Sequence, residues 1–386
     1  MDWTGYTPIY VRTGGSVSYN GLYPTFIGGT DGPKPSPASA YTVAKARVDN
    51  CVLDIGPGTF AGVILLAAWP VRIGVRGVST SASTLASVTG NTYQINIVSD
   101  NTVTITNIIN SSDDGDFGSQ PGGTVILSSC NVGSIDTHSG SSQYEGTTGT
   151  GGTVTLTSST AGAINASSGS AYYNSASNTG NGGTVTLINS TAGAINTTSG
   201  SAYNMGGSGG AVSLTSSTAG AIAALGGYSG YDNSGPGGAV TLTSSTAGNI
   251  NTYSGNADGD SGSGGAVTLT SSTAGNINTY SDDAGSTSGN GGAVSLTGSK
   301  AGLIITRSGS CLYGVGAAGN VTLTNSQPTG INAVGGTSTY ATPGATGTTT
   351  VVGNFSFTKG PWKTNLVLTN WKPPLSKITY LGTGIV

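Results

Sequence analysis

Acidic residues are the side chains of this sequence best suited to chemistry, and several of them come in short clusters. The densest cluster contains Asp113, Asp114 and Asp116. Carboxylates together with loop carbonyls are the ligands that calcium prefers in proteins, although the sequence matches neither an EF-hand nor the nonapeptide repeat of calcium-binding β-rolls. Two interpretations stay open, solvated turn residues and a calcium site. The candidate calcium ligands are Asp113, Asp114, Asp116, Asp258 and Asp260.

Groups that could act in catalysis are sparse and isolated. A glycoside hydrolase needs two carboxyl groups about 5–10 Å apart, but the place of Asp136 is taken by Asn165 in the next sequence repeat. His138 is the only histidine. A lyase also needs a cation for the substrate carboxylate, and no lysine or arginine occurs between Arg76 and Lys300. We therefore predict no catalytic residue, and a polysaccharide depolymerase of the hydrolase type is the enzyme alternative.

Tyrosines recur at one place in the sequence repeats, eight or nine residues after a repeated isoleucine. Rings placed along one ridge could hold sugar rings or bury against another subunit, while packing onto their own coil is the alternative. The loops that carry them vary in length, which is typical of a recognition surface. The candidate ligand-binding residues are Tyr144, Tyr173, Tyr203, Tyr231 and Tyr313.

The elements that must position these side chains are sequence repeats that begin near residue 122. The phrase Gly-Gly-Thr-Val-Thr-Leu-Thr returns with small changes, usually followed by Ala-Gly-x-Ile-Asn. Its valine recurs every 27 to 31 residues, and a leucine and an isoleucine follow at constant offsets. A fixed period in this range is typical of a solenoid. The valines are Val125, Val154, Val185, Val212, Val240, Val267, Val294 and Val321.

Alternation within each repeat predicts its strands. The phrase Thr-Val-Thr-Leu-Thr has period two, so valine and leucine face one side and threonine the other. The Ala-Gly-x-Ile-Asn segment predicts a second strand with isoleucine inward, and a looser third side carries Ser, Gly, Ala and Tyr. We expect three strands per coil of about 27 residues, stacked in parallel with like residues in rows. Glycine pairs such as Gly237 and Gly238 mark a corner that needs a left-handed backbone or close stacking.

The outward threonines form two columns on the predicted strands. Coils repeat at about 4.8 Å, so a flat double column of threonine resembles the ice-binding face of β-solenoid antifreeze proteins. Threonine is also an ordinary residue on an exposed strand face, and Ile188 interrupts one column. The candidate ice-binding residues are Thr155, Thr186, Thr241, Thr268 and Thr322.

The segment before the repeats predicts a short helix over 39–48 and short strands over 52–55, 63–66, 71–75, 93–98 and 103–105. The runs 44–48, 53–60 and 71–77 resemble the entry of right-handed parallel β-helix proteins of the pectin-lyase-like superfamily. There, a capping helix leads to an Ile-x-Pro-Gly-Thr-Tyr/Phe strand and turn. The resemblance implies a right-handed coil and a trimer like that of phage tailspikes. It leaves activity open, because the superfamily contains lyases, hydrolases, tailspikes and adhesins.

The composition narrows the classes of binding partner that we expect for this protein. The net charge is −3, and the stretch between Arg76 and Lys300 carries only acidic charges, so we expect no nucleic-acid partner. No apolar run approaches the roughly 20 residues of a membrane span, and no signal peptide is visible. The cysteines Cys51, Cys130 and Cys311 are far apart, which predicts buried free thiols.

These patterns predict an all-β protein with four parts. Residues 1–37 are a turn-rich, aromatic attachment segment. Residues 38–121 form the capping helix and irregular first coils, 122–338 the regular solenoid, and 339–386 a C-terminal cap or attachment segment. We expect a non-enzymatic structural or adhesive rod of a phage particle or cell surface. It would present tyrosine-bearing loops to a glycan or a partner subunit.

Overall fold

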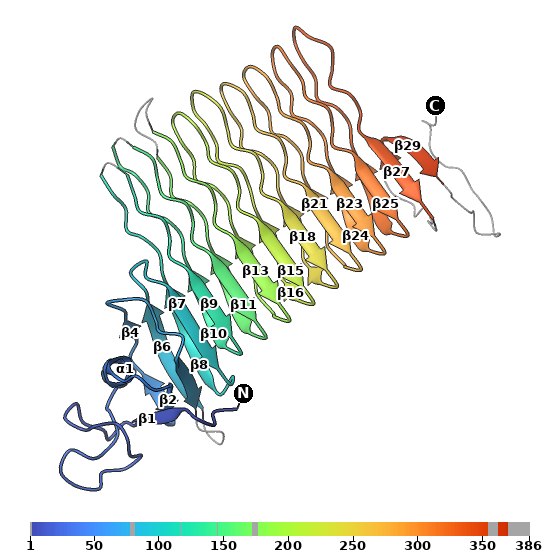
Figure 1. Cartoon of the computed structure of the whole chain (residues 1–386). Helices are drawn as coiled ribbons and strands as arrows, with labels where there is room; N and C mark the ends of the chain where they lie inside the picture. Colours follow the sequence, from blue (N-terminus) through green and yellow to red (C-terminus); the bar gives the residue numbers. More distant parts are fainter. Residues whose placement is uncertain are drawn as a thin grey trace.

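The protein is a parallel β-solenoid of about 11 turns with about 27 residues per turn. The computed structural model describes residues 2–77, 82–116, 118–144, 146–171, 177–353 and 362–369. Figure 1 shows the turns following one another along a rod, with helix α1 (Pro37–Ala46) at the N-terminal end. The solenoid and its period were predicted from the sequence, and both are confirmed.

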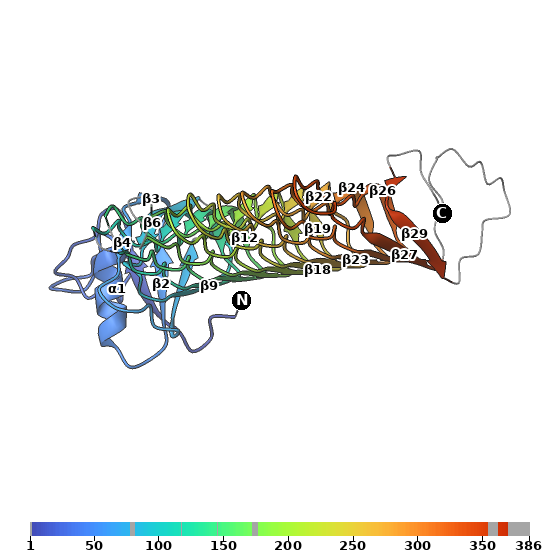
Figure 2. The same ribbon diagram turned by 90° about the horizontal axis from the view of Figure 1, so that it is seen from above.

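Two long parallel sheets lie on opposite sides of the rod (Figure 2). The first sheet has 14 strands. In order they are β1 (Thr7–Val11), β2 (Cys51–Ile55), β5 (Ile73–Gly77), β7 (Ile95–Ser99), β9 (Val125–Ser128), β11 (Val154–Thr157), β13 (Val185–Ile188), β15 (Val212–Thr215), β18 (Val240–Thr243), β21 (Val267–Thr270), β23 (Val294–Thr297), β25 (Val321–Thr324), β27 (Thr348–Val352) and β29 (Asn365–Thr369).

The second sheet has 13 strands, and a separate pair lies beside it. The 13 strands are β3 (Gly58–Phe60), β4 (Val63–Ile64), β6 (Ser83–Thr89), β8 (Val103–Ile109), β10 (Asn131–Asp136), β12 (Thr160–Asn165), β14 (Ile195–Asn196), β17 (Ile222–Ala223), β20 (Ile250–Asn251), β22 (Ile277–Asn278), β24 (Lys300–Ile305), β26 (Gln327–Asn332) and β28 (Trp362–Lys363). The pair is β16 (Thr218–Ala219) with β19 (Thr246–Ala247).

Like residues pair with like in both sheets. Val240 pairs with Val267 and Leu242 with Leu269 in the first sheet, while Ile250 pairs with Ile277 in the second. These side chains are at most 1% exposed. Burial of each such side chain contributes about 1.5–3 kcal/mol. The predicted rows of valine, leucine and isoleucine are therefore confirmed, and we call the part enclosed by the two sheets the strand lobe.

The corner between the two sheets was not predicted. After the repeated first-sheet strands the chain adopts positive φ, usually at a non-glycine residue such as Ser244 (51°), and after β23 at Gly298. The residue that follows Ser244, Ser245, is buried. Its hydroxyl donates to the carbonyl of Thr243 and accepts from the N–H of Ser217 in the preceding coil. The same ladder runs through Ser159, Ser190, Ser217, Ser245, Ser272, Ser299 and Ser326.

The glycine pairs lie at a narrow neck. The N–H of Gly265 donates to the carbonyl of Thr252 at 2.6 Å, and the buried Thr252 hydroxyl donates back to the Gly265 carbonyl at 3.0 Å. A Cβ on Gly264 would lie 1.7 Å from the carbonyl oxygen of Thr279 in the next coil. Close approach of backbones, not a left-handed conformation, therefore explains glycine here.

Beyond the neck, the coils of the regular repeats extend into long loops, and these loops stack beside the strands (Figure 1). We call this stack the loop lobe; residues 253–263 and 280–290 are two of its loops. Its interior holds small residues such as Ser254, Ala257 and Ser261. Successive loops are joined by backbone hydrogen bonds, as between Ser261 N–H and the Thr287 carbonyl, and by single bridges such as Ala257 with Ala284. The expected third strand of each coil is thus wrong for most described coils, because small residues and glycine favour irregular extended backbone.

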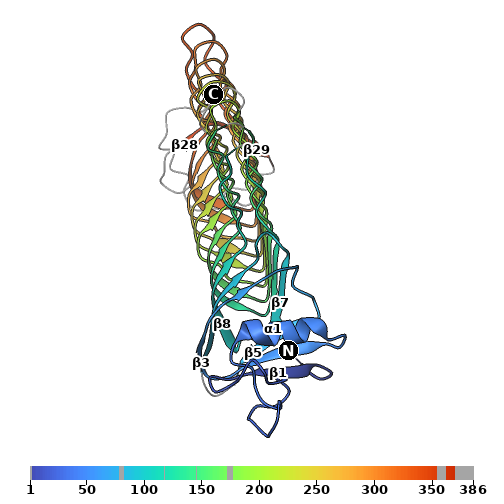
Figure 3. The same cartoon turned by 90° about the vertical axis from the view of Figure 1, so that its left-hand side faces the viewer.

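The N-terminal end is closed by α1, which lies across the first strands (Figure 3). The helix begins earlier and ends earlier than predicted, because Ser36 caps it, Pro37 starts it and the chain is extended at Arg47. Val48, the last residue of the predicted helix, lies beyond its end and is 99% exposed. Strand β1 shows that the segment 1–37 adds to the first sheet; its use in attachment stays a prediction.

At the C-terminal end, Trp362 and Leu366 pack against the core. Phe355, Phe357 and Trp371 of this tail lie outside the described residues. The predicted capping role of 339–386 therefore stays a prediction.

Candidate functional site

An outward column beside the repeated isoleucines carries Asp136 and a row of asparagines. Asn165 donates to Asp136 at 3.1 Å, and Asn196 donates to Asn165 at the same distance. A second stretch joins Asn278 to Asn251 at 2.8 Å. Stacked amides bond along the rod because the coil repeat matches a side-chain hydrogen bond. A glycoside hydrolase would need a second acid close to Asp136, but the neighbouring position in this column holds the amide of Asn165.

His138 is paired with Asp136, with 2.7 Å between Nδ1 and Oδ1. The Asp136 hydrogen bond raises the pKa of His138, against the opposing effect of burial. Burial alone would raise the pKa of Asp136, but the hydrogen bond and charge of His138 outweigh it and lower that pKa. A base and its partner carboxylate are present, and the charge of Asp114 also raises the pKa of His138. Among the described residues, however, no hydrogen bond joins a nucleophile or a second carboxylate to the pair. The pair fits a structural ion pair at the start of the asparagine column.

The acidic loop residues are engaged in local backbone contacts. Asp114 accepts from the N–H of Ser141 at 2.6 Å, and Asp260 accepts from both the N–H and the hydroxyl of Thr287. The Thr287 hydroxyl holds the pKa of Asp260 below its usual value. Across the described residues, no three side chains of Asp, Glu, His or Cys lie close enough together to hold a metal ion. Asp113, Asp116 and Asp258 join no such group, so calcium binding would have to rely on loop carbonyls and stays a prediction.

The structure brings several of the predicted tyrosines into stacked pairs. The rings of Tyr203 and Tyr231 are 5.9 Å apart and nearly parallel, and Tyr231 is 65% exposed. Tyr313 stacks at 5.6 Å on Tyr340, which the sequence pattern did not single out. Tyr144 is exposed. Tyr173 lies outside the described residues.

A further stack was missed because it lies nearer the neck. Tyr253 and Tyr280 are 4.6 Å apart with an interplanar angle of 6°, and the Arg307 guanidinium carbon lies 5.1 Å from the centre of the Tyr280 ring. All three residues are the third after the repeated isoleucines Ile250, Ile277 and Ile304. In each stack, one face of a tyrosine ring is turned toward its neighbour. A tyrosine that lies between two neighbours, such as Tyr280, can therefore offer a ligand only its ring edge and its hydroxyl.

The outward threonines of the first sheet stand in register. Thr241 pairs with Thr268, and both are exposed; Thr243 and Thr270 form the neighbouring pair. Thr155 pairs with Thr186 in the same column, and Ser213 separates this pair from Thr241 and Thr268. Ser295 separates Thr268 from Thr322. A third column, unpredicted, continues past the corner at Thr160, Thr191, Thr218, Thr246 and Thr273.

The three cysteines are buried free thiols, as predicted. Burial raises the pKa of Cys130 to about 12, so this thiol is not a reactive thiolate at neutral pH. The raised pKa of Cys51 has the same main cause.

Comparison of the chain with protein-family models, curated proteins and solved structures gives no significant match. In the part of the chain that the structure describes, no helix has the length and apolar character to cross a membrane.

Proposed function

We propose that this protein is a non-enzymatic structural and adhesive rod. It would serve in a fibre, a spike or a surface layer of a virus particle or cell, and bind a glycan or a partner subunit. The observation that carries the proposal is the set of stacked, exposed tyrosine pairs on the loop lobe, above all Tyr203 with Tyr231. Rings held by a stack lose little conformational freedom on binding, which favours tyrosine as an interface residue.

The rod itself supports the same function. Coil-to-coil hydrogen bonds in both lobes fix the spacing between successive loops. Loop length changes from coil to coil without disturbing the strand register, so recognition residues can vary on a constant scaffold. By resemblance, we propose a right-handed coil and a homotrimer; light scattering of the purified chain tests the trimer, and a monomer at all concentrations would contradict it.

Binding of the full chain to whole bacterial cells and to a glycan array tests the adhesive function. The double variant Tyr203→Ala/Tyr231→Ala should bind at least tenfold more weakly, because it removes a complete stacked pair. The control Thr241→Ala/Thr268→Ala, on the outer face of the first sheet, should bind like the wild type. Equal binding by the tyrosine variant would contradict the assignment of the surface, and released sugar fragments would favour the depolymerase alternative.

Ice binding is a second candidate, favoured by the register of the exposed pairs Thr241 with Thr268 and Thr243 with Thr270. Their separation along the rod is the coil repeat of about 4.8 Å. The wild type should then show thermal hysteresis that Thr241→Lys/Thr268→Lys abolishes and Tyr203→Ala/Tyr231→Ala preserves. No hysteresis in the wild type would exclude this function.

A further inference from the structure

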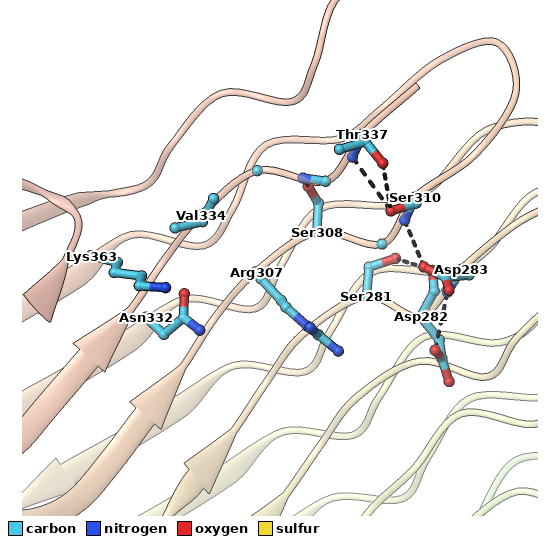
Figure 4. Close-up of a pocket in the computed structure, with 13 residues that line it drawn as sticks. Ser281, Asp282, Asp283, Arg307, Ser308, Ser310, Asn332, Val334, Thr337 and Lys363 are labelled. Atoms are coloured by element: carbon cyan, nitrogen blue, oxygen red, sulfur yellow. Dashed lines mark hydrogen bonds between the residues drawn. The ribbon is translucent and has the colours of Figure 1, made fainter. Parts of the chain in front are cut away.

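A polar groove of about 370 Å³ lies at the C-terminal end of the loop lobe. Three side chains from successive coils line one side of it: Arg307, Asn332 and Lys363. Figure 4 shows these three together, with Asp282 and Asp283 on the opposite side. The size of the groove suits one or two sugar units.

Arg307 is positioned by the aromatic column beneath it. One face of its guanidinium lies over the Tyr280 ring, which in turn stacks on Tyr253. Arginine stacked on an aromatic ring keeps its N–H fork available in the plane of the guanidinium. No ion pair to Arg307 forms within the described residues, and its surface is exposed. This arginine is thus preorganised, and among the described residues its electrostatic partner is the Asp282 carboxylate across the groove, with which it forms no salt bridge.

Asn332 and Lys363 continue the asparagine column into the groove. They are register partners on β26 and β28, so they lie one coil apart. Ile305 occupies the preceding place in that column, so the Asn332 amide has no neighbouring amide to pair with. The structure gives neither the Asn332 side chain nor the Lys363 ammonium a hydrogen-bond partner among the described residues. Among the described residues, two donor groups, the Asn332 amide nitrogen and the Lys363 ammonium, and one acceptor, the Asn332 amide oxygen, are therefore free to bind a ligand beside the guanidinium.

Charge along the chain concentrates cations at this end. Residues 284–386 contain six basic residues and no acidic one, whereas residues 1–283 contain six basic and 15 acidic residues, which gives +6 against −9. In the described part of this end, Lys300, Arg307 and Lys363 follow an acidic middle of the rod, and such a local excess of cations attracts anions.

The acidic residues on one side of the groove limit the negative charge of a ligand that the groove can bind. Asp283 accepts from the N–H of Ser310 at 2.7 Å, and burial raises the pKa of Asp282. A dianionic phosphate would be repelled by these carboxylates more strongly than a monoanion is. A planar carboxylate also matches the guanidinium fork in a bidentate pair.

We propose that this groove binds a carboxylate-bearing sugar unit of an acidic polysaccharide. Arg307 pairs with the carboxylate, Lys363 adds a second cation, and Asn332 bonds to a ring hydroxyl. The inference rests on the proposed adhesive function and names the class of glycan for a site separate from the Tyr203 and Tyr231 pair.

Calorimetric titration of the full chain with a tetragalacturonate tests the proposal, with galactotetraose as the neutral probe. We expect binding of the acidic probe only. Arg307→Gln should weaken it at least tenfold, Lys363→Gln about threefold to tenfold, and Arg307→Lys should fall between the wild type and Arg307→Gln. The matched control is Lys300→Gln, because Lys300 is an exposed cation that does not line the groove and should change the affinity less than twofold. Unchanged melting temperatures confirm that the variants fold.

The outcomes separate this site from the proposed function. Absent tetragalacturonate binding, or equal loss in the Lys300→Gln control, overturns the groove assignment. If cell binding still depends on Tyr203 and Tyr231, the adhesive function stands without the groove. If Arg307→Gln instead abolishes self-association seen by sedimentation, the occupant is an acidic surface of a second copy, and the polysaccharide proposal is wrong.

Discussion

The strand lobe is filled by Val, Leu and Ile side chains, whereas the loop lobe is filled mainly by Ser, Gly, Ala and Thr. Both lobes share one coil repeat, and both are joined from coil to coil by backbone hydrogen bonds. Apolar burial stabilises the first lobe, while close backbone approach and satisfied hydroxyls stabilise the second. The comparison teaches that a solenoid coil can extend far beyond its apolar core if the extension is thin and its polar groups are paired.

The neck is where the two lobes depend on each other most. Gly264→Ala would place a methyl group 1.7 Å from the Thr279 carbonyl oxygen, and that backbone atom cannot rotate away. We expect a loss of about 4 kcal/mol in the free energy of unfolding, measured by chemical denaturation. Gly230→Ala is the control, because its added methyl would meet nothing nearer than 3.7 Å. Similar losses in the two variants would show that glycine at the neck is not required for close packing.

The apolar rows should make the strand lobe sensitive to truncation. Leu242→Ala removes a fully buried side chain from the leucine row, and a loss of about 3 kcal/mol is expected. Thr241→Ala, the adjacent outward position, should change stability by less than about 0.5 kcal/mol. Thermal and chemical unfolding of both variants measure the difference, and equal effects would contradict an aliphatic core.

Removing a hydrogen bond from the serine ladder should lower the free energy of unfolding less than truncating a residue of the apolar rows, but by a measurable amount. Ser245→Ala removes the acceptor of the buried Ser217 N–H, so we expect a loss of about 1–3 kcal/mol. Thr246→Ala, an exposed position next to it, is the control. No difference between the two would mean that another acceptor replaces the hydroxyl.

The smallest effect concerns the pair of Asp136 and His138. Because its pKa is raised on folding, His138 contributes stability below its unfolded pKa and loses it as pH rises through the folded pKa. Partial exposure keeps this contribution small. His138 is the only histidine, so its NMR titration is directly observable. The pKa should exceed 6.5 and fall in Asp136→Asn; an unchanged value in that variant would contradict the pairing.

The aliphatic rows could be predicted from sequence because period-two alternation and a fixed repeat act through local pattern alone. The serine ladder could not, because Ser159, Ser190 and Ser217 satisfy groups of neighbouring coils and a polar residue gives no burial signal by itself. Their constant place, three residues after each leucine, was the one available sign. The groove was missed for a related reason, since Arg307, Asn332 and Lys363 are 25 and 31 residues apart and meet only through coil stacking.

The coil-to-coil hydrogen bonds have a mechanical consequence. They run along the rod in both lobes, so tension between the ends would load them in series and peel one turn at a time. Each detached turn of about 27 residues would lengthen the chain by roughly 90 Å. Under a sudden pulling force, such a rod would dissipate energy in equal extension steps before the contact at its far end dissociated.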